Sequence, residues 1–345
     1  ATRMAGAQPV PRRLRASAPT GSRSSARWPV SKRRSLVAES LLVIASAILL
    51  FGAISLRAER SVLSPPMFFI AVGCLVSSHG LGLLHLEIAS ESVHVLAEVT
   101  LVVILFTDAS RIDLGLLCRE RGLPIRLLGI GLPLTIGLGT VVALWVFRGQ
   151  FSWPEAALLA AILAPTDAAL GQAVVSSSLV PVRIRQTLNV ESGLNDGIVL
   201  PLVLMLASTA SAMAGGGDTG EWLLRGLLAV VVGTTVGGAV GYLGAKGLET
   251  GVRKEWINAS FERLSSLGLA FLAFAAAELA GGNGFISAFV AGLVLGNIGV
   301  HVRDTLHEFG ETEGQLLTLL VFLVFGAVMI PELAEHWHPI NLILS

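Results

Sequence analysis

The stretch NVESGLNDG, residues 189–197, decides the fold of this 345-residue chain. It places several polar side chains in the middle of a predicted membrane span, residues 182–212. Glu191, Ser192, Asn195 and Asp196 follow the spacing i, i+1, i+4 and i+5, which is one face of an α-helix. The opposite face is apolar and carries Leu194, Ile198, Leu200, Val203 and Leu204. The stretch therefore predicts a helix that carries a polar stripe within apolar surroundings.

Composition indicates what those surroundings are. The chain is 53% hydrophobic and only 14% charged, and its mean hydropathy is +0.74. A soluble globule of this size cannot hide so much apolar surface behind so few charges. The composition excludes a cytosolic enzyme, a disordered chain and a nucleic-acid binder, and it predicts an all-α protein that crosses a membrane several times. The two cysteines make neither a disulfide framework nor a metal site, and we find no catalytic nucleophile–base pair, so we expect no enzyme and no cofactor.

Apolar stretches near 20 residues mark the expected membrane spans. Ten such stretches occur, at about 36–56, 65–85, 92–110, 125–147, 154–175, 182–212, 222–245, 262–281, 284–299 and 315–334. An eleventh begins near Pro339, so we expect the chain to be incomplete at its C-terminus. Short linkers make neighbouring spans antiparallel.

Basic residues predict the orientation. Thirteen lysines and arginines fall in the odd-numbered loops and two, Arg148 and Arg225, on the other side. The positive-inside rule therefore places the odd loops in the cytoplasm and the start of the first span outside. Residues 1–34 oppose this orientation, because they hold nine basic residues and no acidic one. We interpret this segment as a disordered tail, or alternatively as the basic start of a signal sequence.

A second stretch, APTDA at residues 164–168, lies one span before the first. It carries Asp167 at membrane depth, where an ionisable side chain is costly and marks a functional site by default. Pro165 interrupts the helix, and an opened helix frees backbone oxygens that can bind ions. Antiparallel neighbours can bring Asp167 and Asp196 to one depth.

The side chains that these two stretches bring to one depth offer a cation only oxygen atoms as ligands. Thr166, Asp167, Ser192 and Asp196 suit a hard monovalent cation such as Na⁺, whereas a transition metal would call for histidine or cysteine. The competing interpretation is a buried polar network that only holds helices together.

Four segments resemble the monovalent cation:proton antiporter family, in its NhaP/NHE branch. They are the two stretches above together with ILFTD at 104–108 and GFISAFVAG at 284–292. The first pair, one helix apart, is specific, whereas the other two are weak alone. The resemblance covers residues 36–345 and implies that 35–345 form an exchanger transmembrane domain. It also implies an inverted-repeat fold of about thirteen helices, so that two or three would follow Ser345, with a dimerisation domain beside a moving core.

The resemblance also implies roles for individual residues. The position matching Asp196 binds both the cation and the proton, and the positions matching Thr166, Asp167 and Ser192 help to coordinate the cation. Asn195 and Glu191 match supporting positions, often linked through a basic residue on a later helix. Relatives often carry glutamate where Thr107 stands here. Asp108 is then expected either to replace it or to belong to an interfacial cluster with Arg111 and Asp113.

The function implied is alternating-access exchange of Na⁺, or of K⁺ or Li⁺, for H⁺ by a homodimer in a cell membrane, such as a bacterial plasma membrane. An Asn–Asp pair in place of the Asp–Asp pair of electrogenic relatives favours electroneutral exchange. A cation channel, or a membrane sensor of cations or pH, could use the same buried acids. Coupling separates these possibilities, because a channel only dissipates a gradient.

Overall fold

The computed structural model describes residues 30–58, 63–83, 91–115, 122–166, 179–214 and 219–335, and within them all regular structure is helical. The helices are α1 (Val30–Ala58), α2 (Pro65–Val76), α3 (Glu91–Ser110), α5 (Gly122–Arg126), η1 (Leu127–Gly131), α6 (Leu132–Val146), α7 (Trp153–Leu163), α9 (Val182–Ala214), α10 (Thr219–Arg253), α11 (Ala259–Leu279), α12 (Gly284–Ile298) and α13 (Val300–Glu335). The short α5, the π-helical turn η1 and α6 follow one another without a break and form a single span.

Length and composition suit these helices to a bilayer. Within the described residues, six helical segments are long and apolar enough to cross a membrane, and four more apolar segments are shorter. These ten segments fall on the ten stretches that hydropathy predicts. The predicted all-α, multi-pass membrane fold is therefore confirmed.

Helix ends differ from the hydropathy prediction in two directions. The helix α2 ends at Val76, because the chain turns through Ser77, whose Oγ donates to the carbonyl of Cys74 at 2.7 Å. The helices α10 and α13 run further than predicted, to Arg253 and from Val300, because polar residues continue a helix beyond its apolar part. The helix α1 begins at Val30, inside the predicted tail; residues 1–29 lie outside the described residues.

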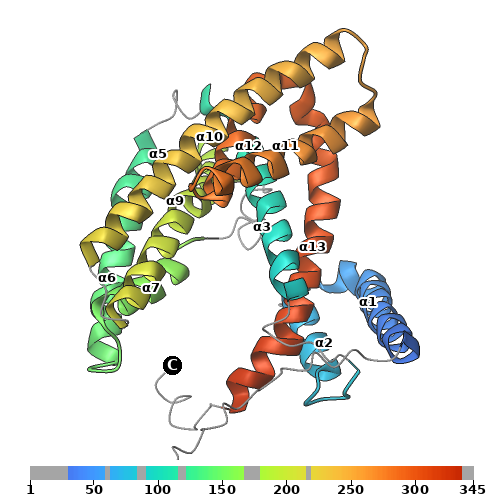
Figure 1. Ribbon diagram of the computed structural model, residues 1–345, viewed down its shortest axis with the longest axis vertical. Helices are drawn as coiled ribbons and strands as arrows, with labels where there is room; N and C mark the ends of the chain where they lie inside the picture. Colours follow the sequence, from blue (N-terminus) through green and yellow to red (C-terminus); the bar gives the residue numbers. More distant parts are fainter. Residues whose placement is uncertain are drawn as a thin grey trace, which may run out of the picture.

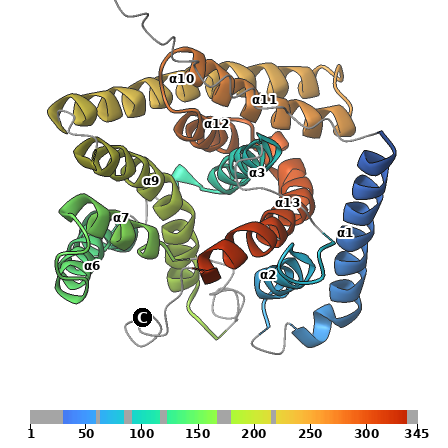
Figure 2. The ribbon, with the colours of Figure 1, turned by 60° about the horizontal axis from the view of Figure 1, so that its bottom comes forward.

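Two groups of helices lie side by side (Figures 1 and 2). The first contains α6, α7 and α9, whose shared apolar cluster includes Leu132, Ala161 and Val199. The second surrounds α3 and α12, with α10 and α11 along one edge and α13, α2 and α1 along the other (Figure 2). The helix α9 links the two groups, because it packs against α3, α10 and α12 of the second group.

Backbone contact holds α12 in the second group. A Cβ atom on Gly292 or Gly296 would overlap the carbonyl oxygen of Phe106 or Ser110 in α3. On its other side, Ser287 of α12 lies directly against Gly237 of α10. Small residues at such spacing let membrane helices approach closely. The glycines at 233, 237 and 241 of α10 thus serve packing within the chain.

A side-chain clamp fixes the end of the same contact. The Asn297 Nδ2 donates to the carbonyl of Ile112 at 2.8 Å, and its Oδ1 accepts from the backbone N–H of Leu114 at 2.8 Å. These bonds satisfy backbone groups just past the C-terminus of α3 that the helix itself leaves open. The pair α3–α12 is therefore tied both by backbone packing and by hydrogen bonds.

Candidate functional site

The helix α7 ends partway through the expected membrane. It begins after Ser152, whose backbone N–H and hydroxyl both donate to Glu155 at 2.7 Å, and it stops at Leu163 after 11 residues. Eleven residues rise about 16 Å, roughly half of a 30 Å hydrocarbon core. Pro165 and Thr166 follow without helical structure, as expected from the proline.

Hydrogen bonds join the end of α7 to the middle of α9. The Thr166 hydroxyl donates to Glu191 Oε2 at 2.8 Å. The Asn195 Nδ2 donates to the Thr166 carbonyl at 3.2 Å and to the Thr166 Oγ1 at 3.1 Å, and it lies 3.5 Å from Glu191 Oε1. Three of the residues expected at the site are thus brought together, across 25 positions of sequence in the case of Thr166 and Glu191.

Asn195 is the most deeply placed member of this network. Its side chain is fully buried, whereas Glu191 is half-buried and Thr166 is exposed. Its Oδ1 is buried and accepts no hydrogen bond from the part of the chain that the structure describes. A buried amide oxygen without a partner carries a desolvation penalty, which a donor or a cation at that atom would relieve.

The other expected residues are placed less completely. Ser192 and Asp196 lie within the helical backbone of α9, and their side chains are outside the described part of the chain. Asp167 lies outside the described residues altogether. Asp108 lies in α3 with a half-buried side chain, one residue after the buried Thr107.

The face of α9 that turns away from Thr166 is apolar. Leu194 and Leu200 pack with Phe289 of α12 and with Leu105 and Ala109 of α3 in one cluster. The Phe289 ring, 8% exposed, lies against the backbone of Gly197, so close that a Cβ atom at 197 would overlap it. Both residues stand in the quoted motifs, but the spacing along one helix cannot reveal a contact between residues 92 positions apart.

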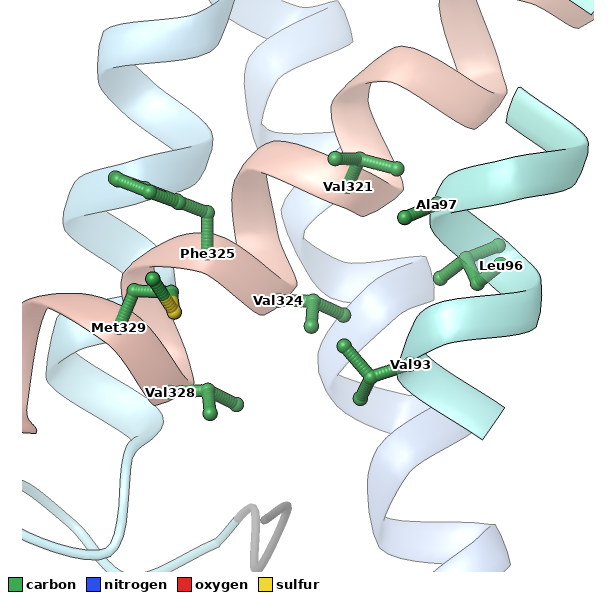
Figure 3. A pocket seen from close by; sticks show the side chains of 8 residues that line it. All are labelled: Val93, Leu96, Ala97, Val321, Val324, Phe325, Val328 and Met329. Atoms are coloured by element: carbon green, nitrogen blue, oxygen red, sulfur yellow. The ribbon is translucent and has the colours of Figure 1, made fainter. Parts of the chain in front are cut away.

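The cavity in Figure 3 is of another kind and lies elsewhere. It occupies about 200 Å³ between α3 and α13. The side chains around it are all apolar: Val93, Leu96, Ala97, Val321, Val324, Phe325, Val328 and Met329. Without a polar group it offers a cation no ligand, so the polar network at α7 and α9 remains the candidate site.

Comparison with known proteins adds to this geometry. Residues 45–345 match the family described as the transmembrane domain of sodium/hydrogen exchangers. The K⁺/H⁺ antiporter NhaP of Alkalimonas amylolytica is 25% identical over 305 residues, which are 87% of this chain and 51% of the relative. The Na⁺/H⁺ antiporter NhaS2 of Synechocystis is 29% identical over 249 residues, 70% of this chain and 44% of the relative. The chain thus spans about half the length of the curated relatives it matches.

A solved structure has the same fold. The sodium proton antiporter MjNhaP1 from Methanocaldococcus jannaschii at pH 8 superposes with a TM-score of 0.66 at 18% identity. The match covers 84% of this chain and 71% of that one.

Proposed function

Because the chain belongs to the sodium/hydrogen exchanger family, we propose that it carries the shared cation- and proton-binding site of a secondary antiporter. Na⁺ is the expected cation, with K⁺ or Li⁺ as alternatives, since the relatives named above include both K⁺/H⁺ and Na⁺/H⁺ antiporters. The observation that carries the proposal is the hydrogen-bonded network of Thr166, Glu191 and Asn195 at the broken end of α7. Within this network, Thr166 directly precedes Asp167 in the sequence, and Asn195 directly precedes Asp196.

The chemistry of this network fits a small hard cation. Carboxylate, hydroxyl and carbonyl oxygens are the ligands that such ions prefer. Thr166 has its hydroxyl proton engaged with Glu191, so its position is set while its oxygen remains an acceptor. In the proposed site Thr166, Ser192, Asp167 and Asp196 coordinate the ion, whereas Glu191 and Asn195 hold Thr166 in place.

Competition for one carboxylate would supply the coupling. Asp196 binds either a proton or a monovalent cation, and never both. The proton-bound and the cation-bound form of the site carry the same charge, so either form can complete the conformational change that moves the site from one side of the membrane to the other. The empty, ionised form carries an uncompensated charge and crosses slowly, because a bare charge in a low-dielectric region is costly. Exchange follows without a separate gate for each ion.

The neighbouring residue bears on stoichiometry. Asn195 is an amide and has no charge to titrate. With Asp196 as the exchanging group, one proton replaces one monovalent cation and the cycle is electroneutral. We further propose that the protein works by alternating access as a homodimer in a cell membrane, with the odd loops in the cytoplasm.

Transport by the full-length protein in liposomes tests the assignment. A pH gradient should drive Na⁺ uptake, and an imposed membrane potential should not shift the gradient at which net flux stops. Asp196→Asn should abolish exchange, whereas Asp113→Asn, the same chemical change three residues past the end of α3, should retain it. Exchange that survives Asp196→Asn would refute the role of Asp196. Cation flux that dissipates gradients without building one would indicate a channel instead.

A further inference from the structure

One contact joins the ion-site helix directly to the second group of helices. The Phe289 ring of α12 covers the backbone of Gly197 in α9, in the space that a Cβ atom would occupy. Gly197 directly follows Asp196. The ring therefore touches the turn of α9 that carries the proposed exchanging carboxylate.

The ring belongs to an apolar layer between α9 and its neighbours. Leu194 and Leu200 join this layer from α9, and Phe289 is one of its buried members. Its other buried members are Leu105 and Ala109 of α3 and Ile112, just past the end of α3. A packed apolar layer stops ions, because an ion that enters it loses its water and gains no ligand.

Neighbouring residues of this turn of α9 face two different environments, one polar and one apolar. Residues 195 and 197 point about 160° apart around a helix of 3.6 residues per turn, so they face nearly opposite sides. Asn195 faces Thr166 on the polar side, and Gly197 faces Phe289 on the apolar side. Position 196 lies between them in register, so the apolar layer begins one residue away from the proposed site.

The same turn is the weak point of α9. Pro201 lies inside the helix, and a proline has no N–H to donate to the carbonyl four residues earlier, which is that of Gly197. A turn that lacks this hydrogen bond and has no side chain at 197 depends on outside contact to keep its shape. Phe289 provides that contact.

We propose that Phe289 is a positioning residue that seals the Asp196-bearing turn of α9 from the α3–α12 side, so that a cation leaves the site only in exchange for a proton. This inference rests on the proposed antiport. It assigns to Phe289 a role in coupling and not only in stability. A phenylalanine that served packing alone would change the amount of folded protein and leave the ratio of exchanged ions unchanged.

Substitution of the ring tests the seal. In liposomes held at zero membrane potential, lumenal pH and ²²Na⁺ are followed together to obtain the protons moved per sodium ion. Phe289→Ala should raise the sodium leak without proton movement by about fivefold, since removing the ring opens space beside the Gly197 carbonyl, a polar group that can hold water there. Phe289→Leu should stay near the parent ratio. The control is Phe69→Ala, which removes a fully buried ring from the separate cluster of α2 and α13.

A size exchange tests the contact itself. Gly197→Ala should slow exchange strongly, because the new methyl group meets the Phe289 ring, and adding Phe289→Leu should restore part of the rate. A parent-like proton-to-sodium ratio in Phe289→Ala would overturn the seal, as would an equal loss of coupling in Phe69→Ala. Either result leaves the antiport proposal standing, provided that the parent protein couples the two ions. If the parent protein couples nothing, the proposed function itself fails.

Discussion

The helices α9 and α12 both lie near the centre of the molecule, and they are held by opposite means. The helix α12 is fixed by backbone packed on backbone, with Gly292 and Gly296 against α3 and Ser287 against Gly237. The helix α9 is held at its middle by side-chain hydrogen bonds to Thr166, by the Phe289 ring and by side-chain packing with α6 and α7, and it contains Pro201. Close backbone packing has few alternative arrangements, whereas hydrogen bonds and a ring contact can be exchanged. We therefore predict that, in the proposed transport cycle, α12 belongs to a rigid support and α9 to the part that rearranges.

The largest effect should come from the rigid side. In Gly296→Ala the added methyl group would overlap the Ser110 carbonyl oxygen. Because that oxygen belongs to the backbone of α3, the overlap is relieved only if the two helices move apart. We expect the yield of monodisperse protein in gel filtration to fall about tenfold or more. The matched control is Gly268→Ala in α11, where an added Cβ meets nothing within 4 Å. Parent-like yields from both variants would mean that α12 tolerates displacement and is no rigid support.

A smaller effect, on transport and not on yield, should come from the polar network of α9. In Thr166→Val the shape is kept, but Glu191 Oε2 and Asn195 Nδ2 each lose a partner. We expect the maximal exchange rate in liposomes to fall about tenfold, equivalent to roughly 1.4 kcal/mol. Thr166→Ser keeps the hydroxyl and should stay within about twofold of the parent. If valine and serine behave alike, the hydroxyl has no part in exchange.

The smallest effect should come from the deformable turn. Pro201→Ala restores a backbone donor opposite the Gly197 carbonyl, which should straighten and stabilise α9. We expect a slightly higher melting temperature together with about twofold slower exchange, because a stiffer turn resists rearrangement. Pro331→Ala makes the same change inside α13 and should leave the rate unaltered. Equal slowing in both variants would argue that helix stiffness in general, and not this turn, limits the cycle.

Hydropathy located the ten apolar helical segments found among the described residues, but not their ends. A window of apolar residues reports which part of a helix suits lipid, and a helix can extend into water on polar residues. For this reason α13 begins at Val300, well before the predicted span at 315. At α7 the helix stops before the apolar stretch does, as Pro165 predicts. The apolar character of 154–175 continues past Leu163, but Pro165 ends the helix there, and a proline has a stronger local effect than hydropathy.

The pairing of residues along one helix could also be foreseen. Glu191 and Asn195 are four residues apart, so any helix places them on one face, and the structure has both on Thr166. The contacts of Gly197 and of Gly296 could not be foreseen in this way. Each depends on which helix arrives opposite, and a glycine in a membrane helix is equally consistent with contact to any neighbour or to lipid.

The amino-acid sequence by itself determined that this chain is helical, that it crosses a bilayer repeatedly, and which helix carries a polar stripe. Each of these follows from local chemistry: apolar length, a fixed turn of 3.6 residues and the missing N–H of proline. Only the tertiary structure decided that Thr166 bonds to Glu191 and Asn195 and that Phe289 lies on Gly197. Those contacts join residues far apart in the chain, and they depend on how closely whole helices approach, which no local pattern records.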